Sequence, residues 1–377
     1  MNHNLKLEGI SSLKTICIVK PDAMGDFLLS IPAIDLLRQM FPESKIYLLV
    51  STATYQIAKG LRSVDVVLPI PLFSNQQRNI EDLISVSKFL HTQESKFDLC
   101  ILMRWDCDYY WASPLIHTIN SIVKLGYSAK CSERKFKDTP DYDLFFNDLN
   151  YDSSIEHEVV KNMKLIGAQI FPKSIYSEYL KISFDAHIHP DNKIAMLFNN
   201  GYYAVAISSS QNFKKLSTKK WISILQIISK EFKLPLVILG GPEDISIAEN
   251  ISKNTKCINL CGLLKPLELI YFLKNCQGLL AVDSFVKHAA SFHSVPIIEF
   301  SPQSKLGNPE SEYGGIRFGA FGSKSILIKP NQPLDSCPND QCNSQESHCI
   351  NNLDEEEIHQ AVNNLFLNNN STEITNV

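Results

Sequence analysis

No part of this sequence has the run of about 18 or more apolar residues that a membrane-spanning helix requires. Residues 1–14, MNHNLKLEGISSLK, are polar and lack the apolar core of a secretion signal. We therefore expect a cytoplasmic protein with reduced thiols. Most of the ten cysteines, including Cys17, Cys100 and Cys257 in apolar runs, are expected to be small core residues.

A strong charge of either sign is also missing. The 36 basic and 40 acidic residues leave a net charge of −4 at pH 7. Such a chain has no overall electrostatic attraction for nucleic acid, and we expect no nucleic-acid partner. Any anion must be bound by local groups instead.

The length and composition indicate a folded protein of two domains. A chain of 377 residues is too long for one ordinary hydrophobic core. The apolar fraction of 44% and the charged fraction of 20% are typical of globular proteins.

Both halves of the chain alternate short apolar strands with helices, a pattern that favours parallel sheets covered by helices on both faces. The predicted strands are 14–20, 45–50, 64–70, 97–103 and 121–127 in the first half, then 203–208, 234–240, 256–260, 278–283 and 295–300. The predicted helices are 27–40 and 81–91, then 221–232, 245–252 and 266–276. We predict an α/β protein with Rossmann-like domains at 1–175 and 176–367, and a mobile tail at 368–377.

The loop after the first strand, PDAMGD, ends in Asp26 at the start of a predicted helix. Gly25 permits a tight, even left-handed turn. Asp26 alone is most simply a helix N-cap, which is worth about 1 kcal/mol. Its carboxylate can instead accept a proton from a substrate hydroxyl, with a pKa lowered by the helix N-terminus. Asp22 is the alternative base.

Three loops of the second half also follow strand ends, where parallel sheets bind ligands. Residues 208–215, SSSQNFKK, supply hydroxyls and lysines that can hold a diphosphate, although a solvated polar turn has the same composition. Residues 240–244, GGPED, lack any nucleotide-binding consensus but place a carboxylate where it can meet a ribose. Residues 283–292, DSFVKHAASF, gather four polar side chains at one helix start, although His288 by itself would be a packing residue.

Taken in order, these segments resemble glycosyltransferase family 9, the ADP-heptose:lipopolysaccharide heptosyltransferases. The resemblance covers about residues 14–365. It rests on TICIVKPDAMGDFLLSIPAIDLLRQMFPESKIYLLV, FDLCILMRWD, VKLGYS and HEVVKNMKLIGAQI in the first half, and on KKLSTKKWISIL, LPLVILGGPED, INLCGLLKPLELIYFLKNCQGLLAVDS and HAASFHSVPIIEFSP in the second.

The resemblance implies the GT-B fold, in which two Rossmann-like domains face each other, and an inverting sugar transfer without a metal or other cofactor. Asp26 would be the general base. The donor, a nucleotide sugar such as ADP-heptose, would bind the second domain. Ser209, Ser210 and Lys214 would contact the diphosphate, Asp244 or its neighbour Glu243 the ribose, and Asp283, Ser284 and His288 the phosphate and sugar. The acceptor would be a lipopolysaccharide core or a related surface glycan.

Two departures from the family pattern put the donor in question. A Thr-Gly pair is usual where this chain has Ser284 and Phe285, and Lys287 can supply charge in place of the missing glycine backbone. A Trp-Pro pair is common where Leu216 and Ser217 stand. A sugar other than heptose stays open.

Two further segments have alternative interpretations. Cys337, Cys342 and Cys349 near His348 have the residue types of a zinc site, but the C-x2-C spacing is absent and we favour no metal there. The basic run AKCSERKFK, with Lys130, Arg134, Lys135 and Lys137, is either a solvated loop or a site for an anionic glycolipid. The second interpretation brings the protein to the inner membrane face.

Two rival functions remain on the same fold. One is a nucleotide-sugar epimerase or hydrolase, which needs no acceptor. The other is a non-catalytic relative that keeps only nucleotide binding, for which the unusual DSFVK segment is the best support and the retained Asp26 the main objection.

Overall fold

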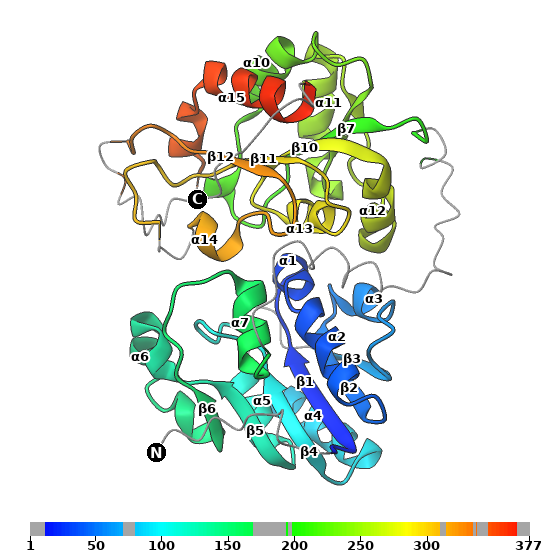
Figure 1. Cartoon of the computed structure of the whole chain (residues 1–377), viewed down its shortest axis with the longest axis vertical. Coiled ribbons are helices and arrows are strands. Elements are labelled where there is room, and N and C mark those ends of the chain that lie inside the picture. Colours follow the sequence, from blue (N-terminus) through cyan, green and yellow to red (C-terminus); the bar gives the residue numbers. More distant parts are fainter. Residues whose placement is uncertain are drawn as a thin grey trace. The chain divides into compact units, whose positions relative to one another are not determined.

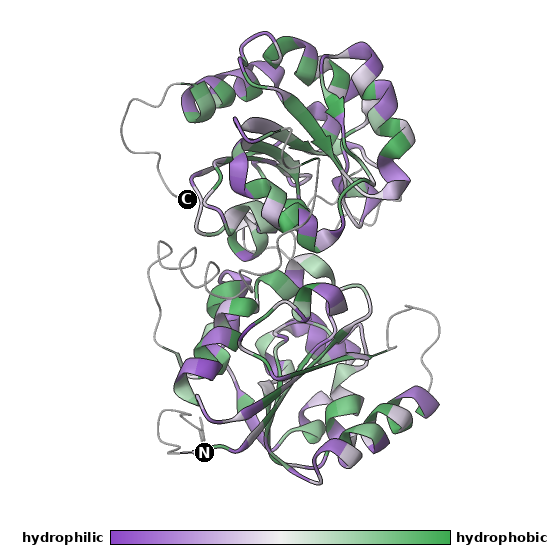
Figure 2. Ribbon diagram, turned by 90° about the vertical axis from the view of Figure 1, so that its right-hand side faces the viewer, coloured by the Kyte–Doolittle hydropathy of each residue, from purple (hydrophilic) through white to green (hydrophobic). Residues whose placement is uncertain are grey.

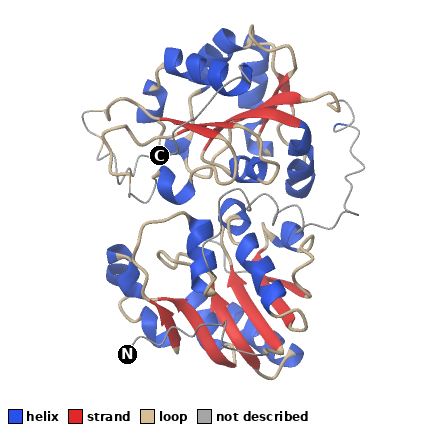
Figure 3. Cartoon of the chain, viewed as in Figure 1, coloured by secondary structure: helices blue, strands red, loops and turns tan. Residues whose placement is uncertain are grey.

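The structure is a computed structural model that describes residues 12–70, 80–168, 194, 198–309, 314–334, 337 and 346–367. These residues belong to two compact units, the first with the residues up to 168 and the second with those from 194 onward. The predicted domain boundary at 175 and 176 and the predicted tail at 368–377 lie outside the described residues. Figure 3 shows that each unit is a sheet with helices around it.

The first unit contains a six-stranded parallel sheet with the order β3-β2-β1-β4-β5-β6 (Figure 1). Its central strand is buried on both faces, since Ile16, Cys17, Ile18 and Val19 have no exposed surface. The strands are β1 Thr15–Lys20, β2 Lys45–Ser51, β3 Val66–Ile70, β4 Phe97–Leu102, β5 Ser121–Tyr127 and β6 Asp148–Asn150.

The helices of the first unit are α1 Met24–Leu28, α2 Ile31–Met40, α3 Tyr55–Ala58, α4 Ile80–Gln93, α5 Ala112–Thr118, α6 Glu133–Asp138 and α7 Glu158–Leu165. The single helix predicted over 27–40 is therefore two helices. Pro32 explains the break, because it has no N–H to donate to the preceding turn and suits the first turn of a new helix. Ser30 stabilises the junction by donating its hydroxyl to Phe27 O at 2.7 Å.

The second unit repeats this architecture with a six-stranded parallel sheet of order β12-β11-β10-β7-β8-β9. Figure 2 shows its strands mostly in the hydrophobic colour. The strands are β7 Tyr202–Ala206, β8 Leu236–Leu239, β9 Ile258–Asn259, β10 Cys276–Val282, β11 Ile297–Phe300 and β12 Ser325–Ile328. The helices are α10 Thr218–Ile228, α11 Ile245–Asn254, α12 Pro266–Phe272, α13 Phe285–Ser291, α14 Gly315–Phe318 and α15 Glu355–Val362.

In each sheet, the chain first adds strands toward one edge and then adds the remaining strands on the opposite side of the first strand. The reversal lies between β1 and β4 in the first sheet and between β7 and β10 in the second. Ligands of doubly wound sheets bind at this switch point, outside the carboxyl ends of the two strands. The loops to inspect are therefore those that follow β1, β4, β7 and β10.

Candidate functional site

The loop after β1 leads directly into the short helix α1. The N-cap position is Ala23, which offers no side-chain hydrogen bond, and Asp26 lies inside the helix in its first turn. The interpretation of Asp26 as an N-cap is therefore wrong. Gly25 is also helical and has no positive φ, so this loop makes no left-handed turn there. Asp26 is half-buried.

Asp22, the alternative base, is engaged by two cations. The Arg104 guanidinium pairs with Oδ1, and Lys20 Nζ lies 3.2 Å from Oδ2. Lys20 is itself buried and donates to Met103 O at 2.8 Å. Burial raises the pKa of Asp22, but the charges of Lys20 and Arg104 outweigh it and leave the pKa below its usual value. Asp22 therefore stays ionised and is poorly suited to accept a proton.

The pKa of Asp26 is shifted in the opposite direction to that of Asp22. Burial, and then the negative charge of Asp22, raise the pKa of Asp26 to about 6, against the weaker influence of Lys20 and Arg104. The prediction that the helix N-terminus lowers the pKa of Asp26 is therefore wrong in direction. The helix has only five residues, so its dipole is outweighed by burial and by the charge of Asp22. A carboxyl with a pKa near 6 is ionised at neutral pH and still has appreciable basicity.

Arg104 is the main residue that sequence reasoning missed in the first unit. It follows β4 across the switch point from Asp22, and its guanidinium lies 5.2 Å from the ring centroids of both Tyr109 and Tyr110. The charges of Asp22 and Asp108 keep its pKa above the usual value despite burial. The available signal was a lone arginine directly after a predicted strand.

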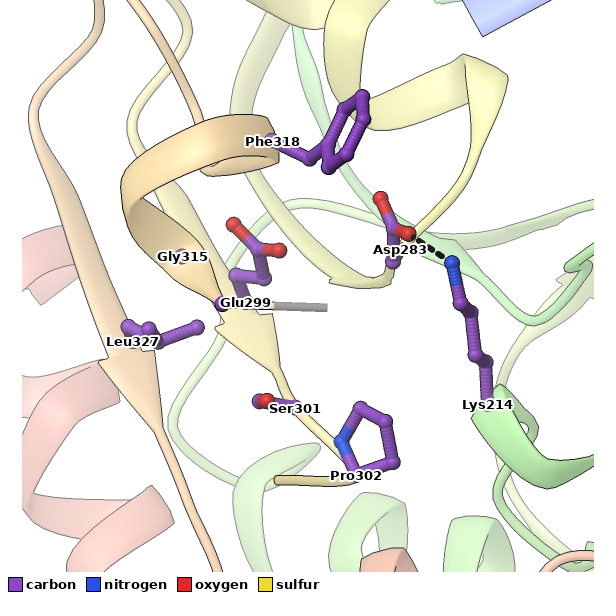
Figure 4. A pocket seen from close by; sticks show the side chains of 9 residues that line it. Lys214, Asp283, Glu299, Ser301, Pro302, Gly315, Phe318 and Leu327 are labelled. Atoms are coloured by element: carbon purple, nitrogen blue, oxygen red, sulfur yellow. Dashed lines mark hydrogen bonds and ion pairs between the residues drawn. The ribbon is translucent and has the colours of Figure 1, made fainter. Parts of the chain in front are cut away.

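The second unit gathers most of its predicted donor-binding residues at the ends of β7 and β10. Ser209 donates its hydroxyl to Asp283 O at 2.9 Å, and Lys214 Nζ lies 2.6 Å from Asp283 Oδ2 (Figure 4). Lys287 Nζ lies 2.7 Å from Asp283 Oδ1, and His288 Nε2 lies 3.9 Å from the same oxygen. One carboxylate therefore organises two lysines and a histidine.

Glu299, on β11, was not predicted and completes this cluster. Its Oε1 lies 2.6 Å from Lys287 Nζ, and Lys287 also donates to Phe318 O at 2.7 Å. Burial would raise the pKa of Asp283, but Lys214 and Lys287 hold it well below its usual value. Burial lowers the pKa of Lys287 less than Asp283 and Glu299 raise it, so Lys287 stays charged.

A small pocket opens beside this cluster. Lys214, Asp283 and Glu299 line it together with Ser301, Pro302 and residues of α14 and β12 (Figure 4). Ser284 is half-buried at the start of α13, and its hydroxyl oxygen has no hydrogen-bond partner among the described residues. Ser210 is exposed next to Ser209. The pocket lining itself contains the Ser301 hydroxyl, the Lys214 ammonium and the carboxylates of Asp283 and Glu299.

The two acidic residues of the GGPED loop have different environments. Asp244 is buried, and its Oδ2 accepts a hydrogen bond from Gly241 N at 3.0 Å. A Cβ atom on Gly240 would lie 2.9 Å from this same oxygen, so the glycine makes room for Asp244 rather than for a ligand. Glu243 is exposed. Of the two predicted ribose contacts, Glu243 is therefore accessible, whereas Asp244 is held within its own loop.

The basic run of the first unit does not form one cationic surface. Lys135 is fully buried, donates to Tyr127 O at 2.9 Å, and lies 3.8 Å from the ring centroid of Tyr142. Burial lowers its pKa to about 8. Its prediction as an acceptor-binding residue is therefore wrong.

The other three basic residues of this run, Lys130, Arg134 and Lys137, are exposed on or before α6. Lys137 pairs with Glu133 at 2.6 Å, and Arg134 lies 3.8 Å from Asp138. Exposed pairs of this kind contribute little stability.

Among the described residues, no helix combines the length and apolarity needed to cross a membrane.

Comparison with known proteins connects both units to one enzyme family. The model of glycosyltransferase family 9 (heptosyltransferase) matches residues 91–299. A candidate glycosyltransferase of Haemophilus influenzae is 20% identical over 323 residues, which are 79% of this chain and 85% of that protein.

Solved structures share the fold at low identity. The family 9 glycosyltransferase of Veillonella parvula has a TM-score of 0.65 at 16% identity, over 94% of this chain and 98% of that one. The E. coli heptosyltransferase WaaC has a TM-score of 0.61 at 17% identity, over 93% and 99%. These relatives have the GT-B class of fold that the two Rossmann-like sheets indicate. The family match extends over more than half of the sequence, and the chain belongs to glycosyltransferase family 9.

Proposed function

We propose that this glycosyltransferase moves a heptose from ADP-heptose to a lipopolysaccharide core or related surface glycan, with inversion at the anomeric carbon. The acceptor hydroxyl oxygen forms the new bond to that carbon while the bond to the diphosphate oxygen breaks. The nucleoside diphosphate leaves with the bonding electrons, and the hydroxyl proton passes to Asp26. Solved relatives support this donor, because WaaC structures contain ADP and ADP-2-deoxy-2-fluoro heptose.

The observation that carries the proposal is the contrast between Asp26 and Asp22. Two carboxylates follow the same strand, and their environments move their pKa values in opposite directions. Such divergence separates a proton acceptor from a permanently charged partner. Asp22 holds Lys20 and Arg104 in place, which leaves Asp26 as the base.

The donor contacts follow from the second unit. Lys214 is half-buried at the pocket and supplies the positive charge for the diphosphate, assisted by the hydroxyls of Ser210 and Ser284. Ser209 acts indirectly, because its hydroxyl is bonded to Asp283 O. Glu243 accepts hydrogen bonds from the ribose hydroxyls. Lysine and hydroxyl donors offset the charge of the leaving group, so the transfer proceeds without a metal.

For the acceptor, we propose Lys130, Arg134 and Lys137. Their exposed ion pairs can open and exchange for the phosphates of a glycolipid, which brings this cytoplasmic enzyme to the inner membrane surface.

The direct test is donor consumption and transfer by the wild type and by Asp26→Ala, with and without acceptor glycolipid. We expect the Asp26→Ala protein to bind ADP-heptose normally but to transfer about 10²–10⁴-fold more slowly. Unchanged transfer would remove Asp26 as the base. Wild-type turnover of the donor in the absence of any acceptor would favour an epimerase or hydrolase instead.

Donor binding has its own test. Lys214→Ala should weaken binding of the nucleotide sugar, whereas Lys219→Ala, which changes an exposed lysine five residues away, should not. Thermal unfolding with ADP-, UDP- and GDP-sugars compares the nucleotides. A ligand at 100 times its Kd adds about 2.7 kcal/mol of stability, so a chain that none of them stabilises lacks the donor site.

A further inference from the structure

Three potential metal ligands come together in the second unit, and none of them lines the pocket described above. The Sγ atoms of Cys337 and Cys349 and a ring nitrogen of His348 all lie within 4.8 Å of one another. The sequence spacing had favoured no metal at these residues, because it lacks a C-x2-C pair. The third cysteine of that pattern, Cys342, lies outside the described residues.

From this geometry we propose that Cys337, His348 and Cys349 bind a zinc ion. Thiolate and imidazole are the ligands that zinc prefers in structural sites. His348 Nδ1 lies 3.0 Å from Cys349 Sγ and accepts a hydrogen bond from Cys349 N at 2.7 Å, so a metal bound through this nitrogen would replace that backbone bond. Zinc bound to both atoms would widen their separation to about 3.5 Å, the distance that tetrahedral bond lengths of about 2.3 and 2.0 Å require. The fourth coordination position is not assigned.

The backbone around the cluster supports a thiolate. Leu334 N donates to Cys349 Sγ at 3.3 Å, and Cys337 N donates to Leu334 O at 2.8 Å. The first bond stabilises negative charge on sulfur, as second-shell donors do at metal sites. The second joins Cys337 to Leu334, the residue whose N–H contacts Cys349 Sγ. Cys349 is buried, whereas Cys337 and His348 are half-buried, so a metal can enter from the surface.

The location indicates a structural rather than a catalytic metal. Ile350 and Leu353, directly after Cys349, belong to the core that packs against the second sheet. Asn351 Oδ1 accepts a hydrogen bond from Ser217 N at 2.9 Å, at the start of α10. Ser217 follows Lys214 by three residues. Zinc would therefore fasten the segment after β12 to the core and hold the end of the loop that carries Lys214.

Metal content of the full-length wild type is the first measurement. The protein is purified under reducing conditions without chelator, and zinc is measured by mass spectrometry. We expect about one zinc per chain, as for one structural site. Replacement by cobalt should then give thiolate-to-cobalt charge-transfer bands and the intense visible bands of tetrahedral Co²⁺.

Variants place the metal on the named ligands. Cys337→Ser and His348→Ala should each lose most of the bound zinc, and Cys337→Ser should also lose the charge-transfer intensity of the sulfur that it removes. Cys257→Ser is the matched control, because it removes another cysteine of the same unit that lies outside the cluster. Cys337 is half-buried, so its variant is expected to fold even if Cys349→Ser does not.

The outcomes separate clearly. Wild-type protein that takes up no more zinc or cobalt than Cys337→Ser would overturn the proposal. This result does not depend on sugar transfer, so failure of the metal site leaves the proposed function intact. Retention of zinc in Cys257→Ser together with its loss in Cys337→Ser establishes the site.

Discussion

Lys287 and Glu299 form an ion pair with 2.6 Å between Nζ and Oε1, and both side chains are buried. Lys287 stands in the segment where family 9 usually has a glycine-containing motif. Because a buried lysine requires compensation, Glu299 on β11 and Asp283 after β10 supply it. The charge of Lys287 is therefore balanced by two carboxylates within the second unit.

Removal of one charge from this cluster should cost much more stability than removal of a balanced pair. Lys287→Met leaves the Glu299 carboxylate buried without its partner, and we expect a loss of about 3–5 kcal/mol in the free energy of unfolding. Lys287→Met combined with Glu299→Gln should recover part of that loss. Urea denaturation measures both. A single variant as stable as the wild type would contradict the balanced-pair explanation.

Substitutions of the two acidic residues of the GGPED loop should have different effects, one on nucleotide-sugar binding and the other on the stability of the fold. Glu243→Gln removes an exposed charge, so we expect weaker nucleotide-sugar binding, by about tenfold, with an unchanged melting temperature. Asp244→Ala removes the acceptor of the Gly241 N–H and should cost about 1 kcal/mol of stability. Titration calorimetry and thermal unfolding of both variants check the assignment, which the reverse pattern would overturn.

Local sequence patterns predicted the edge strands β3 and β9 and every strand inside the two sheets, but not the edge strands β6 and β12. β6 has only three residues, two of them polar, and β12 has only four, so neither was recognised as a strand. Candidate residues after β1, β7 and β10 were found because parallel strands end at a shared edge. Glu299 and Arg104 were missed because their importance comes from partners 12 and 82 residues away. Lys135 was misassigned because a basic run on one helix does not show which lysine points inward.

The pH dependence of transfer should report the charge of Asp22 on Asp26. A general base must be deprotonated, so the wild-type rate should rise with pH through about 6, the pKa of Asp26. Asp22→Asn removes a negative charge and releases Lys20 and Arg104 to act on Asp26. Both effects lower its pKa, so the acid limb should move to lower pH. Glu133→Gln, on exposed α6, should leave the limb in place, and an unmoved limb in Asp22→Asn would argue against the coupling.

The same raised pKa predicts that Asp26 costs stability at neutral pH. The folded chain holds the Asp26 proton up to pH of about 6, whereas the unfolded chain releases it near 3.9. The folded state binds more protons between these values, so its stability falls as pH rises through that window. Asp26→Asn, which carries no charge, should match the wild type below about pH 4 and exceed it by roughly 1–3 kcal/mol above pH 6. Urea denaturation of both proteins from pH 4 to 8 measures this difference. Equal stabilities at pH 7 would mean that water solvates Asp26 well enough to remove the electrostatic basis for its role as the base.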